Sequence, residues 1–327
     1  MADKNLLEID NLSIHYILKE ATVKAVNNLT FSLKSGETIG LVGETGAGKT
    51  TTALGIMQLV QTPPGMVTEG SIHFDGKNLL ETSEAEMRKV RGSQISMIFQ
   101  DPMTSLNPVI PVGEQISEVL LLHENISAKE AEEKAGDMLE KVGIMRSRAK
   151  DYPHQFSGGM RQRVVIAIAL ACSPKLLIAD EPTTALDVTI QAQVLELMKG
   201  LKVEFNTSMI MITHDLGIVA EICDKVAIMY AGTVVEMADK NELFTSPKHP
   251  YTIGLFNSIP DIEKDEDRLK PIKGLTPDPA DLPPGCAFST RCDHAKPECS
   301  QIDPANYEVA KGHFVKCLLF KNQGGAN

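Results

Sequence analysis

The sequence predicts an α/β fold built around a phosphate-binding loop. An apolar run over 38–42 precedes the glycine-rich stretch Gly43-Glu-Thr-Gly-Ala-Gly-Lys49-Thr50-Thr51, and a helical pattern follows it over 51–57. Further along, short apolar runs that end in polar residues alternate with helical patterns. Strands of a parallel sheet that carry ligand-binding groups at their carboxyl ends show this arrangement. The order of strand, loop and helix is the one that a nucleoside-triphosphate site needs.

The glycine-rich stretch matches the G-x-x-x-x-G-K-[ST] spacing in full. Glycines let backbone N–H groups converge on an anion, and the start of the following helix adds positive potential. Lys49 can reach the β- and γ-phosphates, and the Thr50 hydroxyl can ligate Mg²⁺. The alternative is a turn that binds nothing, but the complete pattern in this context favours ATP. The residues expected to contact ATP here are Gly43, Glu44, Thr45, Gly46, Ala47, Gly48, Lys49, Thr50 and Thr51.

Composition indicates a soluble globular chain with one large domain and a smaller one, or two domains. The chain has 327 residues, of which 43% are hydrophobic and 23% charged. Its formal net charge of −11 argues against general binding of nucleic acid through a basic surface. The N-terminus lacks the apolar core of a signal peptide, and no stretch is clean enough to span a bilayer. We therefore expect the chain in the cytosol, where any membrane role comes from docking on another protein.

The elements around the loop are predicted from alternation and helical spacing. Apolar and polar residues alternate over 6–16 and 24–33, which predicts two antiparallel strands before the loop. A strand and turn over 70–76, a helix over 83–90 and a strand over 94–99 follow it. Tyr16 ends the first strand, where its ring could stack on a base or simply pack on the sheet.

A mostly helical insert follows these elements. The segment 101–108 is too rich in turn residues for a helix or strand, whereas apolar residues recur at helical spacing over 112–142. Ser157-Gly158-Gly159 then opens an apolar helix over 164–171. A Ser-Gly-Gly at a helix start can bind an anion, but it is also a common helix cap.

Two carboxylates follow the apolar run over 175–179. Asp180 and Glu181 would stand at the carboxyl edge of a buried strand, where one can hold Mg²⁺ through water and the other can polarise the attacking water. Acidic residues that cap a helix are the alternative, and the upstream loop favours catalysis. After a helix over 188–204, a strand over 208–212 ends near His214, which could contact the γ-phosphate at the same edge.

The last part of the chain changes character. A hairpin over 225–230 and 233–237 and two short helices near 241–244 and 251–258 complete the predicted core. From residue 259 the composition turns to charge and proline, which indicates a linker.

Four cysteines follow the linker with the spacing C-x5-C-x6-C-x17-C: Cys286, Cys292, Cys299 and Cys317. So short a segment needs a covalent or metal crosslink to fold, and a reducing compartment disfavours disulfides. Structural zinc sites usually contain tighter cysteine pairs, whereas four loosely spaced thiolates can ligate a [4Fe–4S] cluster. Spacing alone leaves cluster, zinc and free thiols open. Cys172 and Cys223 lie in apolar helical patterns and are expected to be inert.

Together, these motifs resemble the nucleotide-binding subunit of an ABC transporter from about Leu6 to Met237. The resemblance implies a P-loop NTPase ABC cassette over 1–258, with a RecA-like core, an antiparallel β subdomain and a helical subdomain near 101–156. A linker over 259–285 and a small Cys-rich C-terminal extension over 286–327 complete the implied organisation.

The resemblance also implies roles for individual residues. Glu181 would be the catalytic carboxylate, His214 the switch histidine, and Gln100 the glutamine that joins Thr50 and Asp180 around Mg²⁺. Ser157, Gly158 and Gly159 would form the signature that contacts ATP across a dimer. Asp187 would belong to the D-loop, and Tyr16 would stack on the base. The usual Leu-Ser-Gly-Gly-Gln reads Phe156-Ser-Gly-Gly-Met160 here, which spares the phosphate-contacting residues.

Two further stretches look like the oligopeptide/dipeptide importer ATPases: Ile98-Phe-Gln-Asp-Pro-Met-Thr-Ser-Leu-Asn-Pro108 and Pro247-Lys-His-Pro-Tyr-Thr252. This resemblance implies a peripheral subunit at the cytoplasmic face of the membrane and a [4Fe–4S] cluster on the four cysteines, with zinc as the alternative. The implied partners are a second, non-identical ATPase, two permease subunits and, indirectly, a solute-binding protein, with no nucleic acid. A nickel importer is the close alternative.

Two other classes of protein would share the phosphate loop. A soluble ABC ATPase that acts on nucleic acid or ribosomes usually fuses two cassettes, whereas this chain has one and is acidic. A regulatory module that holds ATP without turnover is disfavoured by the intact Glu181 and His214.

Overall fold

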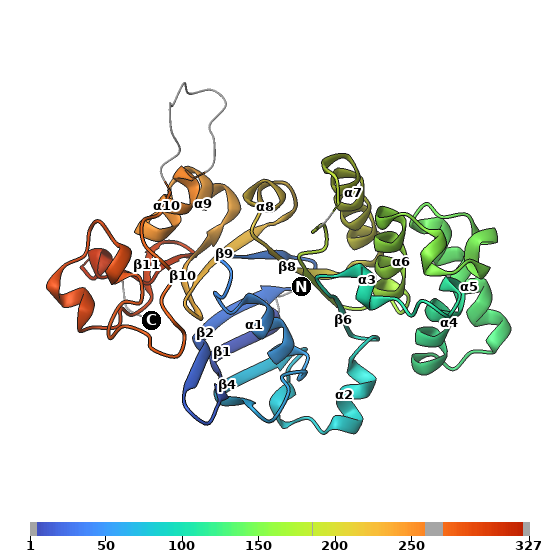
Figure 1. Ribbon diagram of the computed structural model, residues 1–327, viewed down its shortest axis with the longest axis horizontal. Coiled ribbons are helices and arrows are strands. Elements are labelled where there is room, and N and C mark those ends of the chain that lie inside the picture. The colour runs from blue at the N-terminus through green and yellow to red at the C-terminus, as the bar shows by residue number, and fades with distance from the viewer. Residues whose placement is uncertain (1–4, 185, 259–270, 323–327) are drawn as a thin grey trace. The chain divides into compact units, whose positions relative to one another are not determined.

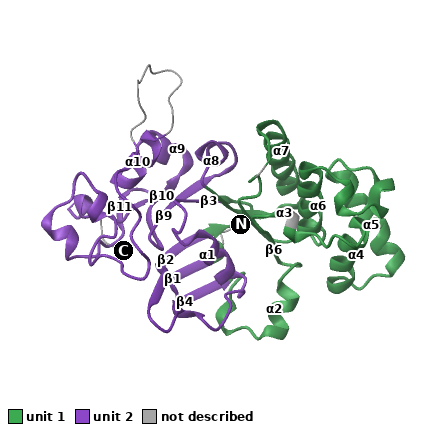
Figure 2. Ribbon diagram, in the orientation of Figure 1, with its two compact units in different colours: residues 1–7, 33–38, 74–213 green, residues 8–32, 39–73, 214–327 purple. Residues whose placement is uncertain are grey.

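The computed structural model describes residues 5–184, 186–258 and 271–322 (Figure 1). The chain divides into two compact units, which Figure 2 distinguishes by colour. Unit 1 comprises residues 1–7, 33–38 and 74–213, and unit 2 comprises residues 8–32, 39–73 and 214–327. Part of the predicted linker, 259–270, lies outside the described residues.

Unit 1 contains three parallel strands in the order β8-β7-β6. They are β6 (Ile95–Ile98), β7 (Leu176–Asp180) and β8 (Ser208–Thr213), and all their residues are buried. The register places Ile98 beside Ala179 and Asp180 beside Ile212. Because parallel strands end at the same edge, the residues that follow them are delivered to one side of the sheet. The predicted polar strand ends are therefore confirmed as neighbours.

The remaining elements of unit 1 are β5 (Lys77–Asn78), α2 (Glu84–Val90), α3 (Pro102–Ser105), α4 (Val112–His123), α5 (Ala128–Lys141), α6 (Gly158–Leu170) and α7 (Val188–Phe205). The helices α4 and α5 pack against each other and against α6. A capping box starts α5, because the Ser127 hydroxyl accepts from the Glu130 N–H while the Glu130 carboxylate accepts from the Ser127 N–H. The helical prediction over 112–142 is confirmed.

One local prediction in unit 1 is wrong. The segment 101–108 was expected to be irregular, but α3 forms one helical turn within it. The hydroxyls of Thr104 and Ser105 both donate to the Asp101 carbonyl, and these side-chain hydrogen bonds stabilise a helical turn despite the turn-rich composition.

In unit 2, three strands lie in the order β2-β1-β4. They are β1 (Asn5–Ile17), β2 (Thr22–Lys34) and β4 (Gly65–Phe74). Each of them extends slightly beyond the bounds of the unit. The helix α1 (Lys49–Ile56) packs closely on β1, since a Cβ at Gly55 would meet the Ile14 side chain at 2.5 Å. This close approach fixes the helix that follows the phosphate loop.

A second set of strands in unit 2 runs in the order β11-β12-β10-β9-β3. The strand β3 (Thr38–Val42) is parallel to β9 (Lys225–Tyr230), which pairs antiparallel with β10 (Thr233–Asp239). The C-terminal strands β11 (Tyr307–Ala310) and β12 (His313–Val315) extend the sheet, because β12 pairs with β10. The sequence did not indicate these two strands, because β12 pairs with a strand about 80 residues earlier and β11 pairs with β12.

Three short helices complete unit 2: α8 (Leu216–Ile222), α9 (Lys240–Thr245) and α10 (Pro250–Asn257). The predicted hairpin around Ala231-Gly232 is confirmed, with both residues at positive φ. Among the described residues, no helix is long and apolar enough to cross a membrane.

Candidate functional site

The phosphate loop in unit 2 requires its glycines. A Cβ at Gly43 would lie 2.2 Å from the Met229 carbonyl oxygen, and one at Gly48 would lie 2.3 Å from the Ala25 carbonyl oxygen. Gly48 also has φ 95°, a conformation that L side chains rarely adopt. A Cβ added at Gly46, by contrast, would meet no atom within 4 Å in the described part of the chain, apart from those of its chain neighbours. The phosphate loop thus packs closely against β2 at Gly48 and against the end of β9 at Gly43, whereas Gly46 has space beside it.

Lys49 is folded back onto the loop. Its side chain is 7% exposed, and its ammonium donates to the carbonyls of Gly43 at 2.7 Å and Glu44 at 3.1 Å. No side chain caps the start of α1, so the helix presents its first N–H groups to the loop, where an anion can accept from them. Thr50 is exposed and Thr51 half-buried on the first turn. This donor set fits a polyphosphate.

The two carboxylates in unit 1 differ in their surroundings. Asp180 ends β7 and is 2% exposed, whereas Glu181 is half-buried and has φ 46°. The Glu181 carboxylate accepts from Gln100 Nε2 at 2.9 Å and from the Thr184 hydroxyl at 3.0 Å. A left-handed glutamate is costly and is held here by surrounding contacts, as is common in functional loops. The structure therefore brings Gln100 and Glu181 into direct contact, a pairing that the sequence did not predict, and their roles toward Mg²⁺ and water stay predictions.

The Ser-Gly-Gly turn begins α6. The Ser157 hydroxyl accepts from the Met160 N–H at 3.4 Å, so it caps the helix and is itself exposed. A Cβ at Gly159 would meet the Ile190 side chain at 2.4 Å, which explains why this position needs glycine.

The two departures from the usual signature have structural consequences. Phe156 is buried, with the Arg148 guanidinium 4.2 Å from its ring centroid. The same guanidinium donates to the Met160 sulfur at 3.6 Å. Both side chains thus serve packing beside the turn and leave the Ser157 hydroxyl and the Gly158 backbone accessible.

Asp187, His214 and Tyr16 take separate positions. Asp187 caps α7 by accepting from the Ile190 N–H at 3.0 Å, and Ala185 before it lies outside the described residues. His214 is exposed directly after β8, and the next residue, Asp215, caps α8. Tyr16 is half-buried in β1, where its ring would lie 2.9 Å from a Cβ built on Gly65. Their roles toward ATP stay predictions.

The predicted site residues are divided between the units. Unit 2 holds the phosphate loop, Tyr16 and His214, whereas unit 1 holds Gln100, Asp180, Glu181, Asp187 and the Ser-Gly-Gly turn. Within unit 1, the contact between Gln100 and Glu181 is direct, and within unit 2, Lys49 contacts its own loop.

Sequence reasoning missed two residues that contact the loop. The Tyr251 hydroxyl accepts from the Glu44 N–H at 3.1 Å, and the Arg291 guanidinium contacts the Glu44 carboxylate at 2.7 and 3.1 Å. Arg291 lies 247 residues along the chain from Glu44, and nothing in its local pattern points to the loop. Its position directly before Cys292 was the available signal.

The four C-terminal cysteines line one pocket, together with His249 and Phe288. Burial raises the pKa of the Cys286 and Cys292 thiols and raises that of Cys317 to about 11. In the described part of the chain, no three His, Cys, Asp or Glu side chains are arranged closely enough to hold a metal ion. The four cysteines thus lie around one pocket, as their spacing suggested, but their thiols are not arranged to hold a metal ion.

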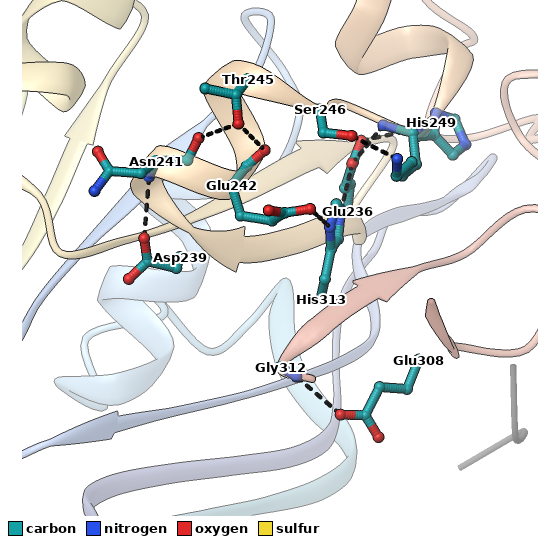
Figure 3. A network of polar contacts seen from close by, with 11 residues as sticks. Glu236, Asp239, Asn241, Glu242, Thr245, Ser246, His249, Glu308, Gly312 and His313 are labelled. Carbon is teal, nitrogen blue, oxygen red and sulfur yellow. Dashed lines mark hydrogen bonds and ion pairs between the residues drawn. The ribbon is translucent and has the colours of Figure 1, made fainter. Parts of the chain in front are cut away.

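A buried polar network joins this C-terminal segment to the core of unit 2 (Figure 3). The fully buried Glu236 carboxylate accepts from the backbone N–H groups of Lys248 and His249 at 2.7 and 2.8 Å. The same carboxylate contacts His313 Nε2 at 2.7 Å, and Glu242 lies 3.5 Å from the other ring nitrogen. The network thereby fixes β12 and the start of α10 to β10.

Comparisons with known sequences show the family to which this chain is related. The family model of the ABC transporter matches residues 26–184, and that of the oligopeptide/dipeptide transporter C-terminal region matches residues 235–299. The oligopeptide transport ATP-binding protein AppD of Bacillus subtilis is 52% identical, over 98% of this chain and 98% of its own length. OppD of Escherichia coli is 51% identical over 96% and 93%. The dipeptide transport ATP-binding protein DppD of Bacillus subtilis is 48% identical over 97% and 95%.

Solved structures of ATP-binding cassettes have a similar fold. The ATP-binding cassette MJ0796, in a dimeric post-hydrolysis state bound to ADP and phosphate, matches with a TM-score of 0.64 and 27% identity. The match covers 72% of this chain and 98% of that one. The protein cbiO1 of Clostridium perfringens, part of the transporter complex cbiONQ, matches with the same TM-score and 26% identity, over 77% and 95% of the two chains.

Proposed function

Because the chain belongs to the ABC transporter family of ATP-hydrolysing subunits, we propose that it energises the import of di- and oligopeptides. The observation that carries this proposal is the similarity to peptide-transport ATP-binding proteins along nearly the whole chain, C-terminal segment included. The intact phosphate loop and the contact between Gln100 and Glu181 support hydrolysis rather than simple retention of ATP.

The phosphate loop would hold the triphosphate. Lys49 and the N–H groups at the start of α1 would neutralise the β- and γ-phosphates, and the open surface at Gly46 leaves room for them. Thr50 and Gln100 would ligate Mg²⁺ directly and Asp180 through water. When bound, Mg²⁺ neutralises charge that develops on the phosphates. A buried carboxylate at a strand end and an exposed hydroxyl are oxygen donors of the type that this ion takes.

Glu181 would polarise the attacking water. Gln100 and Thr184 donate to the same oxygen, Oε2, of its carboxylate, which orients the side chain for this role. His214 would stabilise charge on the γ-phosphate from the exposed position after β8.

A complete site would need two chains. Ser157 is exposed at the start of α6, where the N–H groups of the Ser157-Gly158-Gly159 turn could donate to a phosphate held by a facing subunit. We expect that subunit to be a second, non-identical ATPase, with the helical segment 101–155 docking on two permease subunits at the cytoplasmic face of the membrane. Closure on ATP is then a population shift, because only the closed pair contacts ATP from both sides.

Affinity purification from solubilised membranes tests these partners. Mass spectrometry of the full tagged chain should recover a second ATPase and two polytopic membrane proteins in stoichiometric amounts. The hydrolysis rate per chain should rise with protein concentration or with added partner, since Ser157 acts on a facing site. Recovery of ribosomes or nucleic acid, or concentration-independent hydrolysis by a monomer, would contradict the proposal.

The four-cysteine pocket is proposed to hold a [4Fe–4S] cluster, with zinc as the alternative. Four thiols that line one pocket are a suitable donor set, although no three of them are arranged to hold a single metal ion. The group would act as a structural crosslink in a segment with few buried apolar residues.

Metal analysis of protein purified without oxygen tests this assignment. Iron and sulfide should be present, and replacing any one of the four cysteines by serine should remove them. Replacing Cys223, which is buried away from the pocket next to Gly40, should leave the iron content unchanged. Stoichiometric zinc without iron would overturn the cluster, and absence of both would overturn the metal site.

A further inference from the structure

An ion pair connects the C-terminal segment to the phosphate loop. The Arg291 guanidinium donates through both terminal nitrogens to the two oxygens of Glu44, at 2.7 and 3.1 Å. The Arg291 side chain is 4% exposed and that of Glu44 29%. A bidentate pair shielded from water is stronger and geometrically more specific than a surface ion pair.

Arg291 is itself held in place. Its Nε donates to the Lys273 carbonyl at 2.9 Å, and a terminal nitrogen donates to the Tyr230 hydroxyl at 3.3 Å. Its guanidinium lies 5.7 Å from the Tyr230 ring centroid and 5.9 Å from that of Phe288. Because these contacts already restrict the rotamers of Arg291, its side chain loses little conformational entropy when it pairs with Glu44.

The same aromatic cluster reaches the loop backbone. The Tyr251 hydroxyl accepts from the Glu44 N–H, and the Tyr251 ring packs on Tyr230 and Phe288 with centroid distances of 4.6 and 5.4 Å. Phe288 and Arg291 belong to the C-terminal segment, so that segment contacts both the side chain of Glu44 and the tyrosine that holds its backbone.

Glu44 in turn holds the lysine that binds phosphate. Its carbonyl accepts from Lys49 Nζ at 3.1 Å and from the Ala47 N–H at 3.1 Å. A carboxylate without its cation would also stand beside the site of a polyanion, where like charges repel in a partly shielded setting. Arg291 both fixes Glu44 and cancels its charge.

We propose that Arg291 is a positioning residue of the nucleotide site, which sets ATP affinity by holding Glu44 and, through it, the phosphate loop. The inference deepens the proposed function, because it assigns part of the same ATP site to the C-terminal segment. It requires no metal in the four-cysteine pocket.

Equilibrium binding of ATP to the full chain tests the proposal. Arg291→Gln should raise the Kd for ATP roughly tenfold, the size of effect expected when one charge-assisted contact is lost. Arg291→Lys should recover only part of this loss, since it restores the charge but not the two-pronged contact. In the assembled ATPase the KM for ATP should rise by a similar factor while kcat changes less than about twofold. Asp293→Asn, two residues away in an exposed pair with Lys273, is the matched control and should bind as wild type.

A double-mutant cycle separates positioning from a general loss of structure. In a Glu44→Gln background, Arg291→Gln should change the Kd less than about threefold, because the charge it cancels is gone. An unchanged Kd in Arg291→Gln, or an equal loss in both backgrounds, would overturn the positioning role. Failure of the wild-type chain to bind ATP would instead overturn the proposed function.

Discussion

At the scale of single residues, the clearest functional signal is the conformation of Glu181. Its backbone has φ 46°, although it is neither glycine nor asparagine, and its carboxylate is oriented by Gln100 and Thr184. A chain maintains such a residue when its side chain must point in one direction that regular backbone would not give. We therefore propose that Glu181 serves the chemical step and Lys49 the binding of ATP.

Replacing these two residues should separate the steps. Glu181→Gln keeps the shape but removes the base, so hydrolysis should fall by at least about 100-fold while the Kd for ATP stays within a few-fold. Lys49→Ala should instead weaken ATP binding itself. Rates and Kd values measured on the same preparations check both, with Glu196→Gln on the exposed face of α7 as the control. Wild-type hydrolysis by Glu181→Gln would show that another group is the base.

A second single-residue effect concerns stability. Burial lowers the pKa of His249 to about 4 despite the nearby Glu236 carboxylate, which opposes the shift. The neutral ring suits its partners, since Nδ1 accepts from the Tyr251 N–H and the ring also bonds the Lys316 backbone. Protonation of Nδ1 would place two donors face to face.

The pH dependence of unfolding follows from this shift. Between pH 6.5 and 4 the unfolded chain gains a proton at His249 that the folded chain does not, so stability falls as the pH falls through this window. From pH 6.5 to 5 the loss should be about 1.5 kcal/mol, since the full slope of 1.36 kcal/mol per pH unit applies only once His249 of the unfolded chain is fully protonated. His249→Asn keeps a capping acceptor without titrating, so denaturant unfolding of this variant should show a shallower slope. Equal slopes in both proteins would contradict the assignment.

At the scale of elements, the C-terminal strands are part of the sheet rather than an appendage. The strand β12 pairs with β10, and Glu236 within β10 accepts hydrogen bonds from His313 on β12 and from two backbone groups before α10. The element pairing and the buried polar network therefore depend on the same carboxylate.

Replacing that carboxylate should destabilise unit 2. In Glu236→Gln, an amide N–H₂ faces backbone donors that need acceptors, which should cost about 2 kcal/mol. Glu242→Gln is the matched control, because Glu242 is 45% exposed and lies 3.5 Å from the same His313. Thermal unfolding should show a midpoint lower by several degrees for Glu236→Gln and an almost unchanged one for Glu242→Gln. Similar midpoints would show that the network contributes little.

The elements that the sequence predicted are those with a local signal. Buried apolar runs identified β3, β7 and β8, and apolar residues at helical spacing identified α4 and α5. The missed elements, β11 and β12, are short: β12 pairs with the distant β10, and β11 pairs only with β12 at the edge of the sheet. The helical turn α3 was missed because hydroxyl bonds to Asp101 stabilise it.

The same distinction applies to the candidate site. Motif spacing predicted the phosphate loop, the carboxylates and the gathering of four cysteines, since each follows from residue types at fixed positions. The contact between Glu44 and Arg291 could not be predicted, because it joins residues 247 positions apart and neither has a local pattern that requires the other.

At the scale of the whole molecule, no single unit holds all the residues assigned to ATP. Unit 2 holds the phosphate loop together with the C-terminal segment that fixes Glu44, and unit 1 holds the carboxylates and the Ser-Gly-Gly turn. The similarity to peptide-transport ATP-binding proteins over nearly the whole chain indicates that ATP hydrolysis by this chain is coupled to transport.

Peptide uptake by the complete reconstituted transporter is therefore the most direct measurement of the central claim. Proteoliposomes that contain this chain with its copurified partners and the solute-binding protein should accumulate a labelled di- or oligopeptide only when ATP is supplied on the side of the ATPase. Glu181→Gln should abolish accumulation while leaving the complex assembled, and unlabelled peptide, but not nickel, should compete. ATP-driven accumulation of nickel without peptide transport, or peptide uptake that persists in the Glu181→Gln complex, would contradict the account.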